Sequence, residues 1–175
     1  MDKIIKETIS KIYIEKDYEF YKSVYKKEIS YLSYLIKVTK NFYKEFKVFN
    51  LDNSLEIIIH FINYYRENNF SVQYVTKLQV SKICDIYYIQ HEFNIDNLDP
   101  NRIELKLNGF DNQTYTIDQY ELESKIIDIL SSNNLKQIQF IDLKQIINLN
   151  ETENLLIEKQ ITLEDLLFKN IYNIS

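Results

Sequence analysis

The sequence predicts an α+β fold, with a helical N-terminal half packed on a small antiparallel sheet and with C-terminal helices. Apolar residues recur at helical spacing early in the chain, and β-branched and aromatic residues alternate with polar ones from about residue 83. No Gly/Ser/Pro-rich linker interrupts the 175 residues. They are therefore expected to form one domain, 1–175, helical over about 1–70 and mixed over about 71–175.

Three helical stretches are expected in the N-terminal half, over residues 4–13, 20–46 and 55–67. The second is either one long helix or two helices with a break near Ser30–Ser33. Asp52 or Asn53 is a suitable N-cap for the third helix, and Asn68–Asn69 ends it.

The sheet is expected to follow, with strands over residues 83–95, 103–107 and 114–117. Asn97–Asn101 is the clearest turn, because Pro100 fixes φ and Asn and Asp tolerate tight backbone. An antiparallel hairpin is therefore expected across it. Asn108–Gly109 is a typical hairpin-turn dipeptide.

Helices are expected to complete the fold. Thr116 or Asp118 caps a helix to about residue 130, with Glu121 placed for a capping contact and residues 131–134 ending it. Residues 136–147 fit either a strand or a helix. Thr162 and Asp165 form a capping-box variant that opens a last helix to about residue 172.

Charge is distributed unevenly along the chain. Residues 1–47 carry eleven lysines and seven acids, whereas the rest carries ten basic residues and nineteen acids. Residues 92–128 alone hold nine acids and three bases. Such a concentration of one sign steers and orients a basic partner.

No residue pattern predicts catalysis. Cys84 and His91, with Asp85 and Glu92 beside them, would lie about 23 Å apart and on opposite faces of an extended strand. A single glycine excludes both a dinucleotide fingerprint and a P-loop. We therefore expect a protein that is not an enzyme and has no cofactor.

Metal binding is not expected either. Glu56 and His60 are four residues apart, but two distant histidines do not make a zinc site. Asp96, Asp99 and Asn101 resemble half of a calcium loop, yet the glycine and the closing glutamate of that loop are absent.

Residues 75–86 have the spacing of a helix-turn-helix, but the recognition helix would be poor in basic residues. Direct nucleic-acid binding is therefore not expected. The sequence contains neither an apolar run long enough for a membrane span nor an N-terminal signal-peptide pattern, so no membrane association and a cytoplasmic location are expected.

The segment from His91 to Glu123, in a small, acidic, glycine-poor chain, resembles the immunity proteins of bacterial polymorphic and contact-dependent toxins. Its motifs are His91-Glu-Phe, Asn97-Leu-Asp-Pro-Asn-Arg, Asn108-Gly-Phe-Asp-Asn-Gln-Thr-Tyr-Thr and Tyr120-Glu-Leu-Glu. The resemblance implies a cytoplasmic protein that binds a cognate toxin and blocks its active site. It transfers no catalytic residue.

The expected function is thus toxin neutralisation, with a cognate toxin or another basic protein as the partner. The expected partner-binding residues are Asp96, Asp99, Glu104, Asp111, Tyr115, Tyr120 and Glu121. Two alternatives stay open: a phage-encoded inhibitor of a nucleic-acid-binding defence complex, and a helix-turn-helix regulator.

Overall fold

The computed structural model describes residues 2–26, 29–61, 65–101, 107–147, 149 and 161–169. The helices are α1 (Lys3–Ile9), η1 (Ser10–Ile14, a π-helix), α2 (Tyr18–Tyr25), α3 (Leu32–Thr39), α4 (Ile117–Ser132), α5 (Phe140–Leu143) and α6 (Leu163–Phe168). The strands are β1 (Tyr43–Asn50), β2 (Ser54–Phe61), β3 (Tyr65–Glu67), β4 (Phe70–Ser81), β5 (Ile86–Asn97), β6 (Leu107–Asp111) and β7 (Lys136–Gln137).

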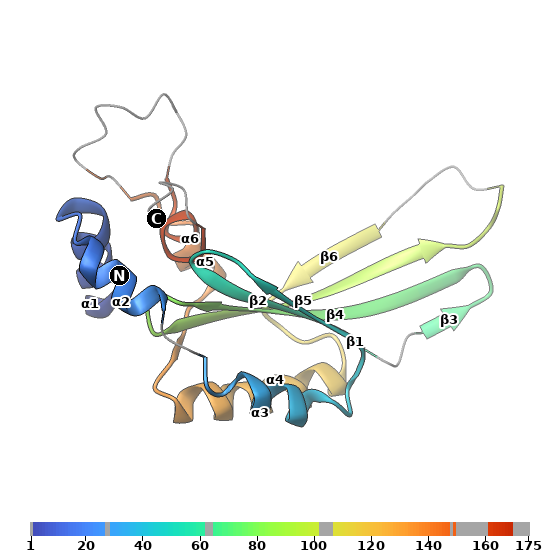
Figure 1. The fold of residues 1–175 in the computed structure, drawn as a ribbon. Coiled ribbons are helices and arrows are strands. Elements are labelled where there is room, and N and C mark those ends of the chain that lie inside the picture. The colour runs from blue at the N-terminus through green and yellow to red at the C-terminus, as the bar shows by residue number, and fades with distance from the viewer. Residues whose placement is uncertain are drawn as a thin grey trace.

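These strands form one sheet of seven strands in the order β1-β2-β4-β5-β6. β3 continues the line of β2 along β4, and β7 pairs in parallel with the beginning of β5. All other pairings are antiparallel. The long strands β4 and β5 form the central hairpin, and they extend well beyond the helices at one end (Figure 1).

One face of the sheet is covered by α3 and α4 (Figure 1). Strand β2 shows why, because its side chains alternate between fully buried and partly buried positions. The main hydrophobic core lies between this face and the two helices. Its largest fully buried members are Leu35, Ile57, Ile59, Leu78, Tyr87, Ile89, Leu122, Ile126 and Leu130.

The opposite face is covered only at one end, by α1, α5 and α6 (Figure 1). A second core lies there, and it contains Cys84, Ile86, Tyr88 and the apolar residues of α6. We call this end of the β4–β5 hairpin the proximal half and the other end the distal half. The distal part of this second face has no helix over it in the described chain.

Polar side chains of the sheet and its turns fix helix α6. Asn53 donates to the carbonyl of Lys169 (3.0 Å), Ser54 to that of Phe168 (3.0 Å), and Ser81 to that of Leu167 (2.8 Å). These bonds satisfy carbonyl groups that a helix leaves unpaired at its C-terminus. Asn53 is buried and also accepts a hydrogen bond from the Tyr21 hydroxyl.

The predicted helical N-terminal half is wrong. Helices occupy residues 3–14, 18–25 and 32–39, so the break expected near Ser30–Ser33 is found, but the chain is already in strand β1 at Tyr43. The predicted third helix is strand β2, and Asn68–Asn69 is the turn that joins β3 to β4. The cause is a run of isoleucines at residues 57–59, which is apolar on both faces and therefore fits either periodicity.

One predicted turn and one predicted strand are also wrong. Asn108–Gly109 lies inside strand β6 and is not a turn. Glycine is required there for space, because a Cβ at residue 109 would lie 2.6 Å from the ring of Phe93. Residues 114–116 form bends leading into α4, which begins at Ile117 with Thr116 as its N-cap.

Other local predictions are confirmed. The hairpin across Asn97–Asn101 is antiparallel, with β5 before it and β6 after it. Thr162 and Asp165 form a capping box, although helix α6 ends at Phe168 rather than at about residue 172. Glu121 is not the capping residue of α4, because the Gln119 side chain accepts from the backbone N–H of Tyr115 instead.

Candidate partner-binding surface

The predicted binding residues fall into two separate groups. Asp96 is near the end of β5 and Asp99 is in the following turn, so both lie at the tip of the distal half. Asp99 accepts a hydrogen bond from the backbone of Asn101 (2.8 Å) and belongs to the turn itself. Glu104 lies outside the described residues.

The second group lies where strand β6 leads into helix α4. Asp111 is exposed at the end of β6, and Glu121 is exposed on α4. The ring of Tyr115 meets that of Phe93 edge to face, with 5.0 Å between centroids, and Tyr120 is 62% exposed. These side chains come from adjacent segments, so one partner can contact all of them.

The two groups do not form one surface. Asp111 pairs with His91 on β5, and Asp96 is five residues further along that strand. Five residues of strand span about 17 Å, and an odd separation places the two carboxylates on opposite faces of the sheet. Asp96 and Asp111 therefore do not belong to one cluster of carboxylates on a single face.

Three exposed apolar residues that the sequence analysis did not select belong beside the second group. Leu107 is 61%, Phe110 55% and Ile117 76% exposed. Their signal in the sequence is weak, because an apolar residue in a strand is normally read as core. We define the β6–α4 surface as Leu107, Asp111, Tyr115, Ile117, Tyr120 and Glu121. Phe110 lies at the same edge but on the opposite face of the sheet, because it pairs with Glu92.

A contact between a histidine and a carboxylate also lies under this region. His91 is fully buried, and its Nδ1 is 3.0 Å from the Thr76 hydroxyl. Its Nε2 lies 3.6 Å from a carboxylate oxygen of Glu123 on α4. This contact links the central hairpin to α4 just beneath the β6–α4 surface.

Cys84 and His91 are not placed to act together. Cys84 belongs to the core under α6, whereas His91 faces α4 on the other side of the sheet. Burial raises the pKa of the Cys84 thiol to about 11, so the thiolate is scarce at neutral pH. The neighbouring Asp85 precedes β5, and Glu92 is paired with Lys77 at 2.8 Å.

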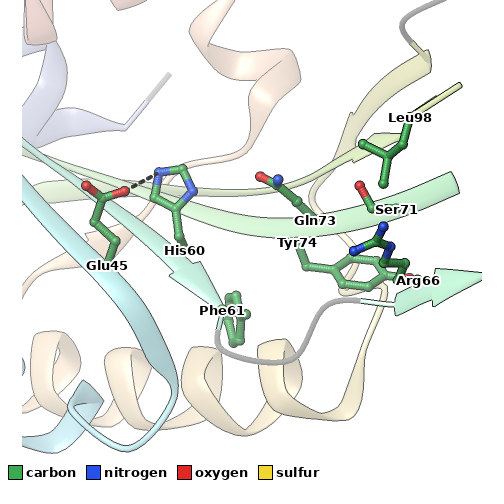
Figure 2. Close-up of a pocket in the computed structure, with 8 residues that line it drawn as sticks. All are labelled: Glu45, His60, Phe61, Arg66, Ser71, Gln73, Tyr74 and Leu98. Atoms are coloured by element: carbon green, nitrogen blue, oxygen red, sulfur yellow. Dashed lines mark ion pairs between the residues drawn. The ribbon is translucent and has the colours of Figure 1, made fainter. Parts of the chain in front are cut away.

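A polar pocket of about 350 Å³ lies in the distal half of the sheet (Figure 2). It is lined by Glu45, His60, Phe61, Arg66, Ser71, Gln73, Tyr74 and Leu98. His60 and Glu45 approach to 3.9 Å. Burial lowers the pKa of His60, with Glu45 opposing, and the imidazole is therefore mainly neutral at pH 7.

The residues considered for metal binding and for DNA binding lie on strands β2 and β4. Glu56 and His60 are both on strand β2, about 13 Å apart along it, and not on one helix turn. The described residues contain no group of three or more potential metal ligands. Residues 75–81 belong to strand β4, so the helix-turn-helix interpretation of this segment is wrong.

Within the described chain, none of the helices has the length and apolar character that a membrane crossing requires. Comparison with protein-family models finds no match, and comparisons with curated proteins and with solved structures find none either.

Proposed function

We propose that this protein is a non-catalytic binding protein of the bacterial cytoplasm, and that it is an immunity protein which neutralises a cognate toxin by covering its active site. The observation that carries the proposal is the composition of the β6–α4 surface. It combines exposed apolar and aromatic side chains with carboxylates.

Exposed aromatic residues are the usual anchors of protein interfaces, and Tyr120 is available for this role. Carboxylates around such anchors steer a basic partner and speed its association. In a toxin that cleaves nucleic acid, the substrate groove is basic because it binds phosphates. The carboxylates of Asp111 and Glu121 are suited to take the place of those phosphates.

The test uses the C-terminal domain of the toxin encoded directly upstream, purified as a catalytically inactive variant. We expect it to bind this protein, and we expect co-expression to restore growth to cells that make the active toxin. Tyr120→Ala should weaken binding at least about tenfold, which is roughly 1.4 kcal/mol. Tyr34→Ala is the matched control, because Tyr34 is 58% exposed on α3 and is not one of the residues of this surface.

Charge reversals separate the two acidic groups. Asp111→Lys with Glu121→Lys should slow association and reduce its dependence on salt, whereas Asp96→Lys with Asp99→Lys should leave both nearly unchanged. The opposite ranking would move the interface to the tip of the hairpin. An upstream domain that neither binds nor is neutralised would reject the immunity function.

A further inference from the structure

We propose that β6 is a docking strand, to which an extended basic segment of the partner pairs so that the partner adds a strand to this sheet. The inference rests on the proposed function and concerns how the toxin is held. β6 forms one border of the sheet (Figure 1), and among the described strands it pairs with β5 alone.

The backbone of β6 has hydrogen-bonding capacity to spare. In an antiparallel pair, alternate residues of an edge strand direct their N–H and C=O groups away from the neighbouring strand. Apart from the ladder with β5, no backbone hydrogen bond links residues 107–111 to another described segment. A row of donors and acceptors is therefore free to pair with an incoming strand.

The side chains of β6 favour such an addition on both faces. Leu107 is on the face that α4 covers elsewhere, and Phe110 is on the opposite face, where its ring meets Phe140 at 5.5 Å. Both are more than half exposed. Gly109 between them presents no side chain, so an added strand would pack against apolar groups without obstruction.

The other border of the sheet, strand β1, is protected against pairing with a further strand. Strand β1 carries Lys47, which is paired with Glu45 at 3.1 Å, and its register is broken by a bulge between Tyr43 and Glu45. Lysines and bulges are the devices by which proteins prevent unwanted strand pairing at an edge. β6 has neither a lysine nor a bulge.

The charge around β6 indicates which kind of segment would pair with this strand. From residue 107 to residue 124 the sequence has four acids and neither lysine nor arginine. Asp111 ends the strand, and Glu121 is exposed nearby on α4. A second copy of this chain would bring two acidic edges together, at an electrostatic cost. A segment rich in lysine or arginine would be attracted instead, and this is the partner we assign.

The experiment measures amide hydrogen exchange in this protein, free and bound to the inactive upstream toxin domain. We expect the outward-directed amides of residues 107–111 to exchange rapidly in the free protein and at least about tenfold more slowly in the complex. Amides of β1 should be unchanged. A complex without added protection at residues 107–111 would overturn the docking strand but leave the immunity function standing.

Binding provides the second measurement. Leu107→Lys with Phe110→Lys should weaken affinity at least about tenfold, and Val48→Lys on β1 should change it less than about twofold. Absence of any complex would reject the immunity function and the docking strand together. Self-association of the free protein through residues 107–111 would also overturn the proposal, because it would identify a second copy as the occupant.

Discussion

The proximal and distal halves of the β4–β5 hairpin differ in how deeply their side chains are buried. In the proximal half, side chains of both strands are buried on both faces, for example Leu78 and Ile89 under α4 and Tyr88 under α5 and α6. In the distal half, side chains from Glu92 to Asn97 are only partly buried, and Phe70 is 52% exposed.

This difference teaches where stability and recognition are located. Strands β4 and β5 extend beyond the helices at the distal end (Figure 1). There, more of their side-chain surface is accessible to solvent or to a partner. The proximal half holds the fold together, while the distal half and β6 present the surface. Substitutions in the two halves should therefore have different consequences, and three predictions test this.

The largest effect is expected from removing core side chains at matched positions. Ile89 and Ile95 are on the same face of β5, six residues apart, and only Ile89 is fully buried. Ile89→Ala should lower the free energy of unfolding by about 3 kcal/mol, and Ile95→Ala by about 1 kcal/mol or less. Urea denaturation measures both. Equal losses would show that the distal half is as tightly held as the proximal half.

A smaller effect is expected at the single glycine. Gly109→Ala should destabilise the protein by about 1–2 kcal/mol, because the new Cβ would press on the Phe93 ring, which Tyr115 also contacts. Removing the ring should relieve the clash. In a Phe93→Ala background the same substitution should cost at least about 1 kcal/mol less, measured as a double-mutant cycle. Strict additivity would exclude the contact as the cause.

The smallest effect concerns the helix that covers the proximal half. Burial raises the pKa of Glu164, but hydrogen bonds and ion pairs with Lys144 and Lys169 outweigh it, and the net pKa is lowered. A carboxylate with a lowered folded-state pKa contributes stability above its unfolded value near 4.5, and this is lost as the pH falls. Thermal unfolding between pH 7 and pH 3 measures the loss.

The Glu164→Gln variant should lose less stability than the wild type over that range. Glu19→Gln is the control, because the Glu19 side chain is 89% exposed in its pair with Lys22. Its unfolding profile should follow the wild type, since exposed pairs contribute little. Identical profiles for all three proteins would remove Glu164 from the account of stability.

Capping signals in the sequence predicted where two helices begin. Thr116 was one of two N-caps expected for α4, and Thr162 with Asp165 was expected as a capping box, because the contacts involved are three residues apart. The helix predicted over residues 55–67 is wrong, because β2 is an interior strand whose isoleucines at residues 57–59 lie on both of its faces. The choice between helix and strand there depends on neighbours distant in the sequence.

The candidate surface was predictable only in part. The abundance of acids after residue 92 is a property of the sequence, but their division between two faces depends on the pairing register of β5 and β6. Asp96 and Asp111 are separated by that register. Leu107 and Phe110 were missed because only the structure shows that β6 is the last strand of its sheet.

The attachment of α6 has a consequence for the order in which the molecule assembles. Asn53, Ser54 and Ser81 bind carbonyl groups of residues 167–169, and the Tyr13 hydroxyl binds that of Leu166. The partners are separated by 86 to 153 positions in the chain. During synthesis, the strands therefore emerge from the ribosome long before the segment that closes their second face. Until residues 163–168 are made, the nascent chain exposes apolar surface, and the second face of the sheet is covered only when α6 docks.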